Sequence, residues 1–146
     1  MNLSQHFTLA EFTRTSTPLP NVPDEAAVAG LVALCVEVLE PLRAALGAPL
    51  RITSGFRSRE VNSVIRGSPT SAHCFGLAAD VKSAAGDAEH ILRVLHQLDL
   101  DELDQAIGYA PHQGGHVHVG LSRPGRTPRR QFLWKDAGGY GLWSPR

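Results

Sequence analysis

The sequence predicts an α+β fold in which helices come first and a small, mainly antiparallel sheet with flanking helices follows. Apolar residues recur at three- and four-residue steps from Val28 to Leu42, as on one face of a helix. Later apolar runs are short and bounded by turn residues, and residues 116–121 alternate as in a strand. We expect a single domain over residues 1–146, with a core at about 4–121 and a basic C-terminal extension at 122–146.

The N-terminal segments carry signals for two helices. Thr8 and Glu11 have the spacing of a capping box, which predicts a short helix after Thr8. A longer helix is expected to begin near Asp24, to kink or break at Pro41 and to end at Gly47. We interpret the apolar stripe of this helix as core scaffold.

Turn residues and local patterns indicate the remaining elements. Ser58 can N-cap a helix, and the polar, turn-rich residues 67–75 predict an irregular surface loop. The linker PHQGG suits a hairpin, because Gly114 and Gly115 tolerate turn dihedrals. The expected strands are residues 50–53, 77–81, 104–110 and 116–121, and the expected helices are residues 59–65 and 87–98.

Charge and cysteine usage exclude several function classes. The 14 basic and 14 acidic residues leave no net charge, which argues against a nucleic-acid binder. Cys35 and Cys74 are the only two cysteines and form no CxxC pair, so neither a disulfide framework nor a thiolate zinc cluster is expected.

The N-terminus, MNLSQHFTLAEF, lacks the basic and apolar regions of a secretory signal. No apolar stretch approaches the roughly 20 residues that span a bilayer, so no membrane insertion is expected. We expect synthesis in the cytoplasm without a signal peptide. Action on a substrate outside the cell would then need another route, such as release by a holin.

Two histidines share one face of the strand HVHVG. Residues two apart on a strand point the same way, so His116 and His118 face one side while Val117 and Val119 face the core. An imidazole pair on an otherwise apolar strand needs partners, because burying it alone is costly. HxH by itself is a weak signal for a site.

A buried carboxylate strengthens that signal. Asp80 lies within the apolar run LAADV, where it would be unfavourable unless paired or coordinated. His73 lies seven residues earlier, in a loop that can fold back over this strand. Two imidazoles and one carboxylate make a three-ligand zinc set with a fourth position for water, so we predict one Zn²⁺ at His73, Asp80 and His118.

Three motifs resemble those of a known family. SAHCFGLAAD (71–80) is similar to the SxHxxGxAxD motif of the zinc D-Ala-D-Ala carboxypeptidases, SGFRS (54–58) resembles their SGYRS element, and HVHVG (116–120) resembles their C-terminal HxH element. The phrases HFTLAEF and LEPLRAALGAPLRITSGFRSREVN resemble phage and prophage members. The resemblance spans about residues 4–121.

The resemblance implies a hedgehog/DD-peptidase-like α+β domain that holds one zinc ion and acts, as a monomer, on the stem peptide of bacterial peptidoglycan. The implied activity is hydrolysis, as a D-Ala-D-Ala carboxypeptidase or an endolysin-like endopeptidase. By motif position His73, Asp80 and His118 match the zinc ligands, Arg57 matches the arginine that neutralises the oxyanion, and Ser71 matches a serine that helps hold the substrate carboxylate.

One departure concerns the general base. Many family members carry a Glu in an ExxH arrangement before the last ligand, but Gly115 occupies that slot. His116 is the best substitute, because an imidazole with a pKa of about 6.5 can accept a proton near neutral pH. The alternative is that His116 only supports the site or contacts the substrate. The sequence does not decide whether Gln105 and Tyr109 line the same cleft.

Two other functions stay open. The missing Glu favours a non-catalytic, zinc-containing module that binds cell wall, as hedgehog proteins use this architecture for recognition. A phage structural protein could instead attach to the wall, with the tail RPGRTPRRQFLWK contacting anionic polymers. Such a basic run is more often a solvated surface. Which peptide bond is cut, and whether the setting is phage lysis or bacterial remodelling, are not determined by the residues.

Overall fold

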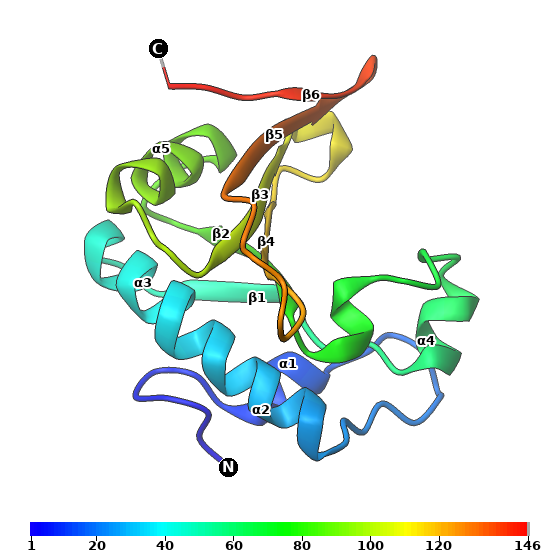
Figure 1. Ribbon diagram of the computed structural model, residues 1–146. Helices are drawn as coiled ribbons and strands as arrows, with labels where there is room; N and C mark the ends of the chain where they lie inside the picture. Colours follow the sequence, from blue (N-terminus) through cyan, green and yellow to red (C-terminus); the bar gives the residue numbers. More distant parts are fainter. Residues whose placement is uncertain (146) are drawn as a thin grey trace.

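The structure is a computed structural model that describes residues 1–145. It contains a six-stranded sheet of order β1-β2-β4-β3-β5-β6, with helices packed around it (Figure 1). The strands are β1 (Leu50–Ser54), β2 (Ala78–Ser83), β3 (Leu103–Tyr109), β4 (Val117–Leu121), β5 (Gln131–Asp136) and β6 (Gly139–Leu142). The helices are α1 (Leu9–Thr13), α2 (Glu25–Leu34), the π-helix η1 (Cys35–Leu39), α3 (Glu40–Leu46), α4 (Arg59–Val64), the 3₁₀ helix η2 (Ala72–Phe75), α5 (Ala88–Leu98) and the 3₁₀ helix η3 (Pro111–Gln113).

The α+β class with flanking helices is confirmed, but the sheet is mixed instead of mainly antiparallel. Strand β3 pairs antiparallel with β4 and parallel with β5, and β5 then pairs antiparallel with β6. The prediction missed this because β5 and β6 lie in residues 122–146, for which the sequence showed no clear period. Side chains of Phe132 and Trp134 pack against the core, and the Trp134 ring lies so close over Gly108 that an added Cβ there would be 2.6 Å from it.

The long N-terminal helix is continuous but changes its winding before the proline. Helices α2, η1 and α3 follow one another without a break, and Pro41 stands in the first turn of α3. Proline has no N–H and its ring crowds the carbonyl four residues earlier, so the π-turn just before Pro41 relieves that clash. Gly47 ends the helix with φ +66°, as predicted.

The capping residues act as the sequence predicts. The Glu11 carboxylate accepts a hydrogen bond from the Thr8 N–H at 3.0 Å, and the Ser58 hydroxyl accepts one from the Val61 N–H at 3.2 Å. The hairpin predicted at PHQGG joins the antiparallel strands β3 and β4. No helix in residues 1–145 is long and apolar enough to cross a membrane.

The helical layer covers one face of the sheet. Residues of β2, β3 and β4 that point to this layer include Val81, Ala106 and Val119, each with no exposed surface. They join one cluster with side chains from α2, η1, α3 and α5. In Figure 1, α3 and α5 lie to the left of the sheet, and α4 lies to the right. The opposite face of β2 and β4 carries the residues predicted to form the site.

Arginines of the basic tail bind residues in the rest of the fold. Arg129 forms an ion pair with Asp104 at 2.8 Å, and Arg130 forms one with Asp99. Arg123 donates a hydrogen bond to the Thr70 carbonyl at 3.3 Å. These intramolecular partners, together with the strands β5 and β6, show that much of the tail is structural.

Candidate metal centre

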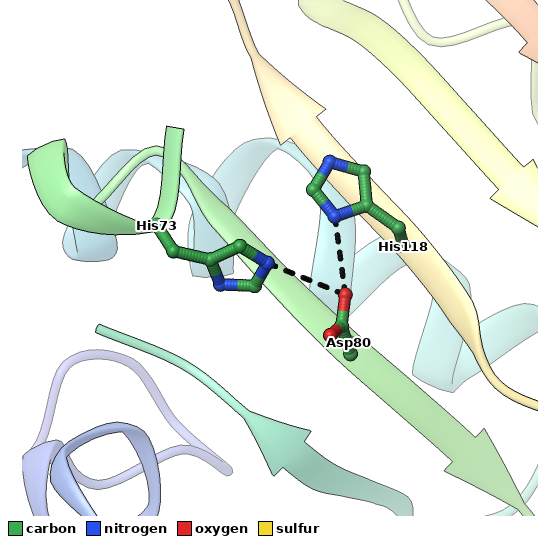
Figure 2. Close-up of side chains that lie close together, drawn as sticks. All are labelled: His73, Asp80 and His118. Carbon is green, nitrogen blue, oxygen red and sulfur yellow. Dashed lines mark hydrogen bonds and ion pairs between the residues drawn. The ribbon is translucent and has the colours of Figure 1, made fainter. Parts of the chain in front are cut away.

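Asp80 and His118 face each other on neighbouring strands. Strands β2 and β4 are antiparallel, and the register places Asp80 directly opposite His118. Their side chains meet with 3.1 Å between His118 Nδ1 and Asp80 Oδ1 (Figure 2). The neighbours Val117 and Val119 are fully buried on the other face, so the predicted alternation is confirmed.

His73 reaches the same carboxylate from η2. Its Nε2 lies 3.4 Å from Asp80 Oδ1, and its side chain is 3% exposed. Its Nδ1 lies 2.7 Å from the Gly55 carbonyl oxygen, which can only accept, so Nδ1 carries the proton and donates. The Nε2 lone pair therefore points to Asp80, which is the orientation that a metal-binding histidine needs.

Two glycines bring η2 close enough for this contact. Gly76 ends η2 with φ +70°, and a Cβ added to it would lie 2.1 Å from the Ala27 carbonyl oxygen of α2. On the facing helix, a Cβ added to Gly30 would lie 2.8 Å from the Gly76 carbonyl oxygen. The loop of residues 67–75 was expected to be an irregular surface segment. It instead ends in a 3₁₀ helix packed on α2, which buries His73.

The protonation states suit metal binding. Burial lowers the pKa of His73, and Asp80 offsets this only in part, so the imidazole stays neutral. Burial raises the pKa of Asp80, but the contact with His118 Nδ1 and the other interactions of the carboxylate in the site outweigh it and hold the pKa well below its usual range. A neutral imidazole and an ionised carboxylate are the forms that coordinate metals.

The geometry fits one metal ion. One ligand atom from each of His73, Asp80 and His118 can be chosen so that all lie within 4.8 Å of one another. Two ring nitrogens and a carboxylate oxygen form a donor set that zinc accepts, and three protein ligands are typical of a catalytic rather than a closed structural site. The structure thus brings together the three residues predicted as ligands.

Arg57 and Ser71 lie beside His73. The Arg57 N–H donates to the His73 carbonyl at 3.2 Å, and the Ser71 hydroxyl accepts from the His73 N–H at 3.3 Å. The guanidinium Nη2 of Arg57 lies 3.5 Å from Ser71 Oγ, and its Nε is buried without a partner among residues 1–145. A guanidinium has five N–H donors, so the terminal nitrogens of Arg57 keep donors for a further group.

His116 approaches the second carboxylate oxygen of Asp80, whereas His73 and His118 approach the first. Its Nε2 is 3.9 Å from Asp80 Oδ2, and its side chain is 23% exposed. Burial lowers the pKa of His116, and Asp80 partly offsets the effect, which favours the neutral imidazole. The nearest upstream carboxylate on β3, Asp104, is bound to Arg129 instead.

The sequence left the face of Tyr109 open and did not point to Tyr140. The ring of Tyr109 stacks on His116, with centroids 4.2 Å apart and planes at 20°. Tyr109 also approaches Tyr140, with 3.4 Å between the hydroxyl oxygens. Tyr109 and Ile107 are two residues apart on β3 and therefore point to the same face, and Ile107 pairs with His118. The sequence does not show which residues of β3 and β4 pair.

Comparison with known families agrees with this geometry. A family model described as peptidase M15 matches residues 5–120. The chain belongs to the peptidase M15 family. This confirms the resemblance drawn from the motifs at 54–58, 71–80 and 116–120, and it assigns the chain to a class of hydrolases. No curated protein matches the chain. The match includes all three candidate ligands and ends before β5 and β6.

Proposed function

We propose that the protein is a zinc-dependent peptidase that hydrolyses peptide bonds of bacterial peptidoglycan, as a D-Ala-D-Ala carboxypeptidase or an endopeptidase. The observation that carries this proposal is the convergence of His73, Asp80 and His118 in a chain of the peptidase M15 family. Action as a monomer on the wall, after a holin-type release from the cytoplasm, belongs to the same proposal.

The donor set supports zinc as the ion that His73, Asp80 and His118 would hold. When bound, zinc supplies a Lewis acid that polarises the scissile carbonyl and lowers the pKa of water. The Gly55 carbonyl keeps the His73 ring in its tautomer and orientation through the 2.7 Å hydrogen bond.

The surrounding side chains have separate roles in this proposal. His116, next to Asp80 and partly exposed, accepts a proton from the attacking water and delivers it to the leaving amine. Arg57, whose guanidinium lies 3.5 Å from Ser71 Oγ, donates to the carbonyl oxygen as negative charge develops there. Ser71, within reach of Arg57, helps to hold the substrate carboxylate.

The test is digestion of purified peptidoglycan by zinc-loaded protein, followed by assay of new free amino groups and mass spectrometry of the released muropeptides. We expect hydrolysis by the wild type, its loss after chelation and its return with added Zn²⁺. His118→Ala should lose zinc and hydrolysis together. His112→Ala is the matched control, because His112 is exposed on η3 and outside the ligand set. Full hydrolysis by metal-free His118→Ala would refute the proposal.

A second candidate is a zinc-containing module that binds cell wall without cutting it. The absence of a carboxylate at Gly115 favours this candidate. It predicts sedimentation of the zinc-loaded protein with insoluble peptidoglycan and no release of amino groups.

A further inference from the structure

The face of the sheet that carries the metal centre continues into β5 and β6. The register aligns Asp80 with His118, His118 with Ile107, Ile107 with Leu133, and Leu133 with Leu142. Directly paired residues in a sheet point to the same face. One row of side chains therefore runs from the candidate metal centre to the edge strand.

A second row is joined by side-chain contacts. His116 is 3.9 Å from Asp80 and stacks on Tyr109, and Tyr109 meets the Tyr140 hydroxyl at 3.4 Å. The Lys135 ammonium lies 5.4 Å from the centre of the Tyr140 ring. Lys135 and Tyr140 belong to the hairpin formed by β5 and β6. In Figure 1 the tip of the β5–β6 hairpin stands beside the loop that joins β3 and β4. The Ala110 N–H of that loop donates to the Lys135 carbonyl at 2.9 Å.

The outer part of both rows is open to solvent. Tyr140 is 60% exposed and Leu142 is 86% exposed. The Lys135 ammonium donates to the Asp136 carbonyl, and no carboxylate pairs with it among residues 1–145. An ammonium has three donors, so at least one stays available for an anion. Exposed apolar side chains next to an available cation suit a ligand that is partly apolar and partly acidic.

We propose that the β5–β6 hairpin is a substrate-binding wall that holds the stem peptide of peptidoglycan beside the metal centre. Lys135 binds an internal carboxylate of that peptide, and Tyr140 and Leu142 pack against its apolar groups. This proposal rests on the proposed function and extends it. Stem peptides combine alanine methyl groups with free carboxylates, which matches the charge and apolar surface of the wall. Because the family match ends at residue 120, the wall is an addition to the matched part of the fold.

The charge test compares two substrates. A muropeptide with free internal carboxylates and its counterpart with these carboxylates amidated are digested by zinc-loaded wild type, Lys135→Met and Lys135→Arg. We expect Lys135→Met to lower the preference in kcat/KM for the free carboxylate by about two- to fivefold, through KM, as for loss of one partly exposed ion pair. Lys135→Arg should retain most of that preference. Arg43→Met removes a cation from α3 in the helical layer and should leave the preference unchanged.

The apolar test uses Tyr140→Ala and Tyr140→Phe. Alanine removes the ring and should raise KM for both substrates, whereas phenylalanine keeps the packing surface and should restore most of the affinity. An unchanged KM in Tyr140→Ala and an unchanged charge preference in Lys135→Met would overturn the proposed wall while leaving the peptidase proposal intact.

If the wild type releases no amino groups, a binding measurement still tests the substrate-binding wall independently of the proposed peptidase activity. Calorimetry of the same muropeptides then compares the Kd of wild type and Lys135→Met. A Kd that is about two- to fivefold weaker in the variant, and only for the free carboxylate form, supports the substrate-binding wall in a non-catalytic protein. Equal Kd values would overturn it.

Discussion

The two faces of the central strands carry side chains of opposite character. On β2, Val81 points into the helical layer with no exposed surface, while its neighbour Asp80 points to the candidate metal centre. On β4, Val119 and His118 divide in the same way. A β-strand lets one segment do both, because successive side chains alternate between faces. The core face supplies stability, and the polar face uses that rigidity to hold charged groups in place.

The largest expected effect comes from comparing a substitution of Asp80, on the polar face, with a substitution of Val81, on the core face. Asp80→Asn should weaken zinc binding by more than about a hundredfold, because losing a ligand costs more than losing the residues that orient one. Val81→Ala should keep zinc binding but lower the free energy of unfolding by about 1–3 kcal/mol, through two lost methyl groups and a cavity. Zinc titration and urea denaturation measure the two effects. Equal losses of zinc affinity in both variants would contradict the division between faces.

The next comparison is between two glycines with positive φ, Gly76 and Gly47. An added Cβ would clash with another helix only at Gly76. Gly76→Ala should lower both stability and zinc affinity, because an added Cβ would lie 2.1 Å from the Ala27 carbonyl oxygen and push η2, with His73, off α2. Gly47→Ala is the control, since Gly47 has a similar φ of +66° but open space around it. That control should cost only about 1 kcal/mol and leave zinc affinity unchanged. Equal zinc affinity in the two variants would show that the packing of η2 on α2 does not position His73.

The stability of the metal-free protein should depend on pH, because the pKa values of His73 and Asp80 are lowered in the folded state. His73 has a pKa below 6.5 in the folded state, so below about pH 6.5 the unfolded chain takes up a proton that the folded chain does not. The free energy of unfolding should therefore fall as the pH drops from 6.5, and Asp80 should add to this only below about 3.8.

The control for this pH effect is His73→Asn, which keeps an N–H donor for the Gly55 carbonyl but does not titrate. Its stability should fall less between pH 6.5 and 5 in chemical denaturation. A wild-type stability that rises on acidification over this range would contradict the assignment.

The smallest effect is expected where the tail joins the sheet away from the site. Asp104→Asn weakens the ion pair with the half-exposed Arg129, so it should cost no more than about 1 kcal/mol in thermal unfolding. Zinc affinity should not change, because Asp104 lies outside the ligand set. A change in zinc affinity would show that the tail and the centre are coupled.

Much of the site could be predicted because its signals are local. The alternation in HVHVG and the carboxylate within LAADV indicated that His118 and Asp80 face away from the core, and both do. The turn-rich loop 67–75 was harder to interpret. Nothing local shows that Gly30 and Gly76 let η2 pack on α2, and that packing buries His73.

The sequence alone determined the α+β class, the capping residues, the helix end at Gly47 and the chemistry of the three candidate ligands. Local periodicity and the spacing of residue types contain that information. Only the tertiary structure decided that Asp80 lies directly opposite His118, that β5 runs parallel to β3, and that Tyr140 reaches Tyr109. These contacts join segments far apart in the chain, and their register depends on how whole strands pair and pack.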